Sequence, residues 1–469
     1  MQKVYDNCFV MDRRCYDEYA LSEDILMEHA ARGMAEYIKA NFPPKTSILI
    51  VSGIGNNGAD GIVLARQLHL DYNISLYIPH SVKSDMAQIQ LHRTKRVGVR
   101  IVDEVVDSDV IVDAIFGAGL NRDIDDKTKE LIETLNKKDA YKIACDVPTG
   151  ILEDGELCSG TFKADTTITM GALKKSLYSD KAKDFVGEII CVDLGISRDM
   201  YEIESDTYLL EWSDMKLPTR DKLSTHKGMF GHSAVFVGEK VGAGVISAMA
   251  TSRFGSGLTT LITQESITPP YHLMYASELP YNTTAIAIGM GLGEFFDDRF
   301  LQKNVIDKNI PIVLDADAFY KPKLLEILHQ TNREIVITPH PKEFASLWEI
   351  LTNKRVDVEY IQSHRFEVVQ KFSKLYPHVT LLLKGANMLI AKEKQTYINP
   401  YGDARLSKGG SGDVLSGLIV ALLAQGYNSL DATISASLAL CKAVSLYDGA
   451  SFGMLSEDII DAIAKIEAK

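Results

Sequence analysis

The stretch "ILIVSGIGNNGADGIVLARQL" (residues 48–68) places a glycine-rich turn between an apolar run and an apolar, helix-like segment. The β-branched residues before the turn favour a buried strand. Glycines at 53, 55, 58 and 61 leave backbone amides uncovered, and these can face an anion at a helix N-terminus. The stretch therefore predicts a strand–turn–helix unit, the repeating unit of a parallel α/β sheet.

The same alternation extends on both sides of this turn. Further strand-like runs cover residues 109–116, 141–147, 166–170 and 187–196. Before the turn, residues 22–41 read as a helix, with Ser22 as N-cap, a stripe of apolar residues from Leu26 to Ile38, and "NFPP" as its end. The first half is thus expected to form a doubly wound α/β sheet with its active groups at the strand ends.

A polar, proline-containing stretch at residues 204–228 interrupts this alternation, and a second glycine-rich series follows it. We place a domain boundary near residue 212, which gives two domains, 1–211 and 212–469. The second domain is also expected to be α/β, with strand-like runs at residues 284–293, 310–319, 334–341, 379–390 and 396–402.

Bulk composition excludes several classes of function. The chain has 469 residues and a formal net charge of -13, which argues against a nucleic-acid or anionic-membrane partner. No apolar run is long enough to span a bilayer, and the start lacks the apolar centre of a secretory signal, so a cytoplasmic location is expected. Six scattered cysteines indicate reduced thiols rather than a zinc site or disulfide framework.

Polar residues gather at three predicted strand ends of the first half. Asn56, Asn57 and Asp60 lie in the glycine-rich turn, while Asp113 and Asp146 each end a strand-like run. Both aspartates could instead be helix N-caps. Because three such loops meet at one sheet edge, a polar pocket is the preferred interpretation.

In the second half, "LSKGGSGDVLSGLI" (residues 406–419) places three glycines and Asp413 directly before an apolar helix. Bare backbone amides and the helix dipole can hold a transferring phosphoryl group. A carboxylate beside phosphate repels it, which makes sense if Asp413 takes the proton of the attacking hydroxyl. The alternative is an aspartate that merely stabilises the first helical turn.

The first-half loops "NNGADG", "DAIFGAGLNRD" and "CDVPTG" resemble the epimerase domain of bifunctional NAD(P)H-hydrate repair enzymes, which has a Rossmann-like three-layer fold. The resemblance implies Asp146 as catalytic acid/base, for which a raised pKa is expected, and a potassium site. The implied potassium ligands are Asn57, Asp113 and Thr149. The implied substrate-binding residues are Asn56, Asn57, Gly58, Ala59, Asp60, Gly117, Ala118, Gly119, Leu120, Asn121, Arg122, Asp123 and Asp146. Ala59 and Ala118 depart from the usual glycine and threonine.

In the second half, "HKGMFGHSAVFVG", "GMGLG", "LDADAF", "TPHPKEF", "LLLKGAN" and "NPYGDARLSKGGSGD" follow the order seen in ribokinase-like NAD(P)H-hydrate dehydratases. The resemblance implies Asp413 as catalytic base, Mg²⁺, and ADP as co-substrate. The implied substrate-binding residues are Ala243, Gly291, His340 and Asp413. The implied nucleotide-binding residues are Lys384, Gly385, Ala386, Asn387, Met388 and Gly412. Met290 and Lys408 depart from the family pattern.

Together the two resemblances imply a metabolite-repair enzyme that interconverts the R and S forms of hydrated NADH and NADPH. It would dehydrate the S form with ADP, giving AMP and phosphate, and act as a homo-oligomer. The alternative is a ribokinase-like small-molecule kinase fused to a ligand-binding module. Six residues also have ordinary structural interpretations: a turn for His340, a solvated strand end for Lys384, helix caps for Asp315 and Asp317, and surface positions for His226 and His232.

Overall fold

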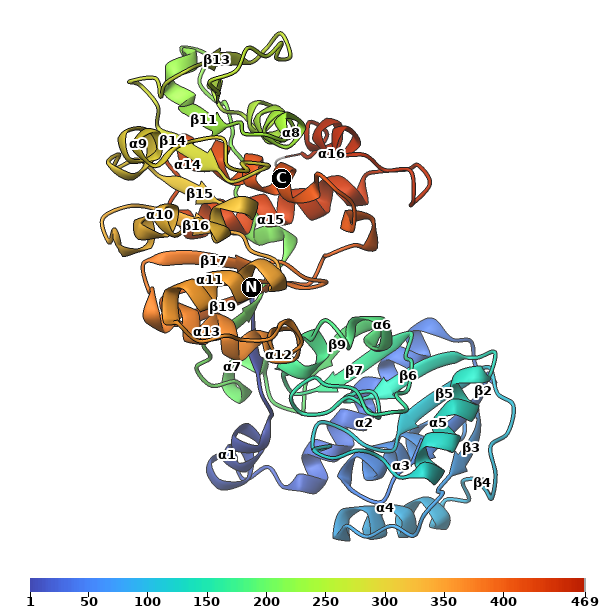
Figure 1. The fold of residues 1–469 in the computed structure, drawn as a ribbon. Coiled ribbons are helices and arrows are strands. Elements are labelled where there is room, and N and C mark those ends of the chain that lie inside the picture. The colour runs from blue at the N-terminus through green and yellow to red at the C-terminus, as the bar shows by residue number, and fades with distance from the viewer. Residues whose placement is uncertain (468–469) are drawn as a thin grey trace. The chain divides into compact units, whose positions relative to one another are not determined.

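The computed structural model describes residues 1–467, and the chain divides into two compact units between Ser205 and Asp206 (Figure 1). This division precedes the boundary expected near residue 212. Strand β10 (Thr207–Leu209) explains the difference, because it pairs in parallel with β19 (Gln395–Asn399) and so belongs to the second unit. Among residues 1–467, no helix has the length and apolar character needed to cross a bilayer.

The first unit contains a seven-stranded, fully parallel sheet in the order β4-β3-β2-β5-β6-β7-β9. The strands are β2 (Ser47–Ser52), β3 (Asn73–Tyr77), β4 (Ile101–Val102), β5 (Val110–Ala114), β6 (Tyr141–Cys145), β7 (Thr166–Met170) and β9 (Glu188–Val192). A short pair, β1 (Gln2–Tyr5) with β8 (Leu173–Lys174), lies beside them in the same unit. The order reverses at β2, so the cleft at the carboxyl ends of β2 and β5 is the expected ligand position.

Helices cover both faces of this sheet, which makes the unit a three-layer sandwich. They are α1 (Phe9–Tyr19), α2 (Glu23–Asn41), α3 (Asn56–Leu68), α4 (Asp85–Arg96), α5 (Asp126–Lys137), α6 (Lys183–Val186) and α7 (Arg198–Tyr201). One apolar cluster joins α2 and α3 to one face of the strands, and a separate cluster joins α5 to the other. The predicted stripe from Leu26 to Ile38 is confirmed as buried, and Ser22 occupies the N-cap position without a side-chain capping bond.

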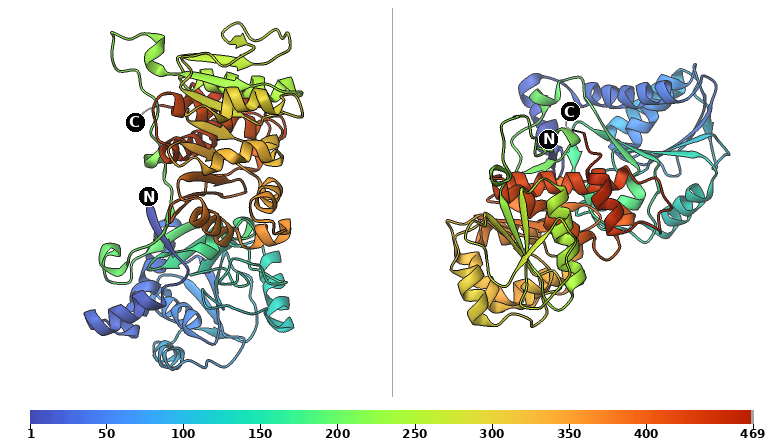
Figure 2. Two further views of the ribbon diagram at one scale, coloured as in Figure 1. Left: turned by 60° about the vertical axis from the view of Figure 1, so that its left-hand side comes forward. Right: turned by 90° about the horizontal axis from the view of Figure 1, so that it is seen from above.

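The second unit is built on a mixed sheet in the order β13-β12-β11-β14-β15-β16-β17-β18-β19-β10. Its further strands are β11 (His232–Phe236), β12 (Leu258–Ile262), β13 (Met274–Ala276), β14 (Ala285–Ile288), β15 (Ile312–Leu314), β16 (Ile335–Ile337), β17 (Val379–Leu383) and β18 (Met388–Lys392). Helices lie on both faces (Figure 2). They are α8 (Val241–Arg253), α9 (Asp298–Leu301), α10 (Pro322–Leu325), α11 (Pro341–Thr352), α12 (Val358–Ser363), α13 (Arg365–Leu375), α14 (Ser411–Ala424), α15 (Ser429–Ser445) and α16 (Ser456–Ile463).

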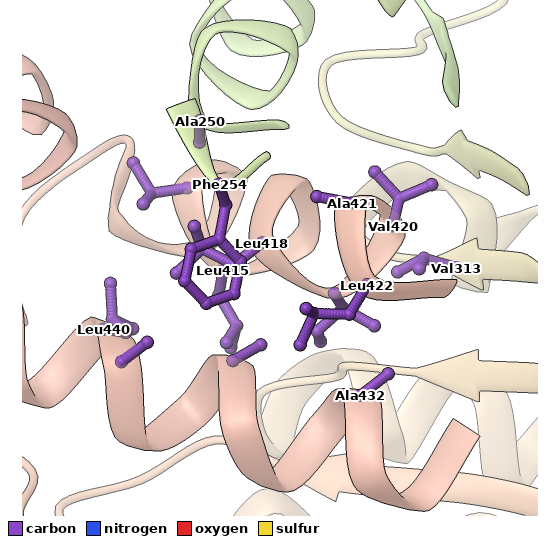
Figure 3. Packing of buried hydrophobic residues seen from close by; sticks show 14 of the residues in the cluster. Ala250, Phe254, Val313, Leu415, Leu418, Val420, Ala421, Leu422, Ala432 and Leu440 are labelled. Atoms are coloured by element: carbon purple, nitrogen blue, oxygen red, sulfur yellow. The ribbon is translucent and has the colours of Figure 1, made fainter. Parts of the chain in front are cut away.

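Helix α14 is the centre of the second unit's core. Every residue from Val414 to Ala424 is buried, and Leu415, Leu418 and Leu422 lie among apolar side chains that include Phe254 (Figure 3). Burying a leucine of this kind contributes about 1.5–3 kcal/mol. This packing holds the N-terminal end of α14, where Asp413 lies, in a defined position.

One predicted strand is divided in the structure. The apolar run at residues 379–390 forms the antiparallel hairpin β17–β18, with Lys384 to Asn387 as its turn. Apolar periodicity does not distinguish one long strand from two short ones, whereas Gly385 and Asn387 favour a turn between them.

Candidate functional sites

The three polar loops of the first unit meet at the carboxyl ends of β2, β5 and β6, as expected. They enclose a cavity of about 500 Å³ together with residues of α1, α2 and β8. Among the predicted substrate residues, the cavity is lined by Asn56, Asn57, Asp60, Gly117, Ala118, Gly119, Leu120 and Asp146. The cavity size suits a small organic ligand.

Five of the predicted substrate residues do not line this cavity. Ala59 is fully buried, and a Cβ at Gly58 would lie 2.1 Å from the Gly53 carbonyl oxygen, so both positions serve close packing. Asn121 and Arg122 are exposed, and Asp123 accepts backbone hydrogen bonds from Ile124 and Ser159. Only part of each predicted loop therefore lines the cavity.

Asp146 lies in the cavity as a fully partnered carboxylate. Its Oδ1 accepts hydrogen bonds from Lys174 Nζ at 2.6 Å, Thr169 Oγ1 at 3.2 Å and the Met170 amide at 3.2 Å, and its Oδ2 accepts one from the Ala118 amide. Burial alone would raise the pKa of Asp146, but the Lys174 ammonium and these donors outweigh it and lower the pKa below its ordinary value. The expectation of a raised pKa was wrong, because the sequence does not reveal the lysine.

Lys174 is the main residue that sequence reasoning missed here. Its ammonium is enclosed, with the side chain only 3% exposed, and it also donates to Thr169 Oγ1 at 2.9 Å and the Met170 carbonyl at 3.1 Å. The pairing of β1 with β8 positions it. Nothing in "GALKKSLY" distinguishes Lys174 from its neighbour, so no sequence signal was available.

The proposed potassium ligands Asp113 and Thr149 are in direct contact. Thr149 donates to the Asp113 carboxylate through Oγ1 at 2.7 Å and through its amide at 2.8 Å. Asp113 is fully buried with no cationic partner among residues 1–467, and burial raises its pKa to about 6 despite these bonds. The buried Asn57 amide nitrogen has no hydrogen-bond partner in the same part of the structure.

In the second unit, Asp413 lies in the first turn of α14 beside an ion pair. Lys384 Nζ donates to Asp315 Oδ1 at 2.6 Å, and Ser416 Oγ donates to Asp315 Oδ2 at 2.7 Å. A Cβ at Gly412 would lie 3.3 Å from Lys384 Nζ, so the glycine loop and the β17–β18 turn are adjacent. The structure thereby brings together Gly412 of the glycine-rich loop and Lys384 of "LLLKGAN", two predicted residues that are distant in the sequence.

Burial raises the pKa of Asp413 to about 7, and the negative charges of Asp315 and Glu343 act in the same direction while Lys384 opposes them. Asp315 is almost fully buried, and its side chain makes no helix-capping bond. Asp315 therefore occupies the N-cap position of the 3-10 helix Ala316–Tyr320, but its carboxylate is bound by Lys384 and Ser416 instead of capping the helix. A carboxyl group with a pKa near neutrality is suited to proton transfer.

The remaining predicted residues surround this centre in different ways. His340 caps α11, because its Nδ1 accepts from the Lys342 and Glu343 amides, and its own amide donates to Glu343. Its other ring nitrogen lies 3.1 Å from Glu343 Oε1. Ala243 and Gly291 are neighbours, since a Cβ at Gly291 would lie 3.2 Å from the Ala243 Cβ.

The β17–β18 turn has no space for a larger residue at Gly385. A Cβ there would lie 2.2 Å from Nη1 of Arg365, whose Nη2 donates to the Leu383 and Lys384 carbonyls. Asn387 and Met388 are buried, and Met388 begins β18. A larger residue at Gly385 would therefore displace Arg365.

The structure also places Met290 and Lys408, the two departures from the dehydratase pattern, and His232, which was expected at the surface. Met290 is fully buried in the core, and Lys408 is exposed and donates to the Phe452 carbonyl at 3.3 Å. His232 is not a surface residue, since it is buried and its ring nitrogens lie 3.0 Å from Asn282 Oδ1 and 2.7 Å from Thr260 Oγ1.

Comparison with known proteins finds relatives over both units. A family model described as NAD(P)H-hydrate dehydratase matches residues 234–465, and one described as YjeF-related protein N-terminus matches residues 23–176. The bifunctional NAD(P)H-hydrate repair enzyme of Helicobacter pylori is 39% identical, covering 99% of this chain and 100% of that protein. The enzyme of the same name from Dictyoglomus turgidum is 33% identical, covering 90% and 89%.

A solved structure also matches. The ADP/ATP-dependent NAD(P)H-hydrate dehydratase of Bacillus subtilis, co-crystallized with ATP/Mg²⁺, is 26% identical, with a TM-score of 0.46. The match covers 53% of this chain and 92% of that one.

Proposed function

Because the chain belongs to the family of bifunctional NAD(P)H-hydrate repair enzymes, we propose that the first unit, Gln2–Ser205, carries its epimerase activity and the second unit, which begins at Asp206, its dehydratase activity. The enzyme repairs hydrated NADH and NADPH. In this proposal the first domain interconverts the R and S hydrates and the second converts the S hydrate back to the reduced cofactor. The cavity of the first unit and the Asp413 centre of the second are two separate chemical sites, which supports this division.

The epimerase site is the cavity at the carboxyl ends of β2, β5 and β6. Asp146 acts there as acid/base, and the residues that line the cavity hold the hydrated nucleotide. Asp146 enters the reaction as the anion, because Lys174 and the surrounding donors stabilise its ionised form. An ionised carboxylate can accept a proton from water that adds to the ring.

A potassium ion fits the donor set of Asn57, Asp113 and Thr149. The supporting observation is the buried Asp113 carboxyl, whose pKa is raised to about 6 and which has no cationic partner among the described residues. Oxygen ligands of this kind suit a hard cation. Bound there, potassium would supply the positive charge that the ionised carboxylate lacks.

The dehydratase site is centred on Asp413. The hydrate is held by Ala243, Gly291, His340 and Asp413, and the nucleotide by Gly412 and residues 384–388. The observation that carries this assignment is the enclosed Asp413 carboxyl at the N-terminus of α14, with a pKa near neutrality and an ammonium group nearby. This arrangement can hold a phosphoryl group and deprotonate a hydroxyl beside it.

The chemistry then proceeds in two steps. Asp413 takes the proton from the ring hydroxyl, whose oxygen attacks the terminal phosphoryl group of ADP, and AMP leaves. The electron pair of the ring nitrogen next expels phosphate by breaking the carbon–oxygen bond, and transfer of a proton from the adjacent ring carbon to water or to the departing phosphate restores the dihydronicotinamide. Mg²⁺, when bound with the nucleotide, neutralises charge on the phosphates.

The test is repair of a mixture of hydrated NADH epimers by the purified full chain, with Mg²⁺, K⁺ and either ADP or ATP. Complete return of dihydronicotinamide absorbance with ADP supports both activities and the donor. Recovery that stops with the R epimer remaining contradicts the epimerase assignment, and a stable phosphorylated product would favour a kinase. A cytoplasmic location and a homo-oligomeric state stay predictions.

A further inference from the structure

Two carboxyl groups lie in the wall of the same cavity but have opposite sets of partners. Asp146 accepts four hydrogen bonds, including that of the Lys174 ammonium. The Asp60 side chain lines the cavity and has no hydrogen bond or ion pair within residues 1–467. Asp60 is half-buried in the cavity wall, and a carboxyl that faces a ligand cavity with no protein partner is free to bind a ligand.

The surroundings of Asp60 favour its neutral form. Burial and the negative charges of Asp146, Asp12 and Glu23 raise its pKa well above the ordinary value, and the Lys174 ammonium opposes them. Asp12 belongs to α1 and Glu23 to α2, so carboxyl groups from several elements face the same space. Lys174 is already held by Asp146 at 2.6 Å. Asp60 is thus a proton donor beside a separate proton acceptor.

We propose that Asp60 is the catalytic acid of the epimerase site, donating its proton to the departing hydroxyl of the hydrated ring while Asp146 acts as the base. This inference rests on the proposed epimerase function and assigns the second proton-transfer group that the reaction requires. The sequence identified Asp60 only as part of a substrate loop.

The steps balance as follows. Asp60 protonates the hydroxyl oxygen, the carbon–oxygen bond breaks, and the ring-nitrogen electron pair forms a carbon–nitrogen double bond, which leaves a cationic ring, water and an ionised Asp60. Water then adds to the opposite face of the ring, Asp146 takes one proton from it, and the nitrogen regains its electron pair. Transfer of that proton from Asp146 to Asp60 through water restores the starting state.

Lys174 is a positioning residue in this scheme, because it acts only through Asp146. It holds the Asp146 carboxylate in its ionised form, so that the two carboxyl groups keep different roles. Lys174→Met removes the ammonium and keeps the Asp146 carboxyl, so the pKa of Asp146 should rise. Epimerisation should then begin at a higher pH than in the wild type. A purely structural role would lower the rate without moving that pH.

The decisive experiment follows conversion of the purified S hydrate of NADH to the R hydrate by the full chain, without nucleotide so that the dehydratase is idle. For Asp60→Asn we expect kcat to fall by about a hundredfold or more with KM within about threefold, because an acid acts on the transition state. Asp107→Asn is the matched control, since Asp107 is exposed and pairs with Lys138. Thermal unfolding of the same preparations, followed by circular dichroism, verifies that both units of each variant are folded, which ADP-dependent activity of the second unit alone would not show.

A kcat of Asp60→Asn close to that of the wild type, or a rise in KM alone, overturns the inference and leaves Asp60 as a binding residue. Such a result would leave the proposed function intact, since the wild-type chain would still epimerise. Absence of epimerisation by the wild type overturns both. A loss of kcat in Asp107→Asn equal to that in Asp60→Asn also counts against a specific role for Asp60.

Discussion

Two enclosed aspartates of the first unit have carboxyl pKa values that move in opposite directions. Burial raises the pKa of Asp113 to about 6, since only neutral donors face it. Burial acts on Asp146 in the same way, but the Lys174 ammonium reverses the result. The difference between the two residues is one charged neighbour, because each pKa records the balance of desolvation against nearby charge.

Asp113 allows a test of the potassium site through stability. Its folded pKa of about 6 lies above its ordinary 3.8, so its contribution to stability is complete below about pH 4 and is lost as the pH rises through about 6. The difference corresponds to about 3 kcal/mol. A bound cation offsets this loss, so KCl should raise the melting temperature more at about pH 7.5 than at about pH 5.

NaCl at equal ionic strength is the control for general screening, and Asp113→Asn should remove the potassium-specific part. Equal effects of the two salts, at both pH values, would contradict a potassium site at Asp113. Thermal unfolding followed by circular dichroism provides the measurement.

Asp413 gives a second pH dependence. A base must be ionised to accept a proton, and the pKa of this carboxyl is raised to about 7 by burial, Asp315 and Glu343. The ADP-dependent dehydration rate should therefore rise as the pH increases through about 7 and level off above it. Asp413→Asn should lower kcat by about a hundredfold or more. A rate that is independent of pH between about 5 and 9 would argue against Asp413 as base.

The N-terminus of α14 depends on backbone that only glycine provides. Gly410 is the N-cap residue with φ of 96°, and a Cβ there would lie 2.4 Å from the Ser456 hydroxyl oxygen of α16. A Cβ at Gly409 would meet nothing within 4 Å. Adjacent glycines thus have different reasons to be present: one for conformation and packing, the other for uncovered backbone amides.

These glycines form a matched pair of variants. Gly410→Ala should destabilise the protein by about 1–3 kcal/mol through left-handed strain and the contact with Ser456, and lower the melting temperature by several degrees. Gly409→Ala should leave the melting temperature within about one degree. Equal melting temperatures for the two variants would show that the loop does not hold Gly410 in the left-handed conformation.

At the level of the whole chain, each unit has its own core and its own site. The apolar clusters that enclose the first sheet contain only residues of the first unit, and the cluster around α14 contains only residues of the second. Each site can therefore be inactivated by a substitution that leaves the other unit's core unchanged. The family's two activities call for such independence. Hydration gives two epimers, the dehydratase acts on one of them, and the epimerase converts the other.

This predicts different endpoints for two variants of the full chain. Asp413→Ala should abolish repair of both epimers, whereas Asp146→Ala should stop repair partway, with the R hydrate remaining. Return of dihydronicotinamide absorbance, with the epimers separated by chromatography, measures both. The experiment must use conditions in which spontaneous epimerisation is negligible, and complete recovery by the Asp146 variant there would contradict its assignment.

The main features of the fold were predictable because they depend on local patterns. Apolar runs identified most strands, the stripe from Leu26 to Ile38 identified α2, and the glycine-rich turn before Gly58 identified the start of α3. The hairpin β17–β18 and the pair β1–β8 were not predicted. Short strands carry little periodicity, and their pairing depends on neighbours that are distant in the chain.

The sequence by itself determined which polar residues end the strands and which glycines precede α14, because turns and helix ends require particular residue types at particular positions. Only the tertiary structure decided the ionisation of those residues. Asp146 is 28 positions from Lys174, and Asp315 is 69 from Lys384 and 101 from Ser416. Electrostatic interaction depends on distance in space and on burial, and both are set by the packing of the whole unit rather than by the order of residues.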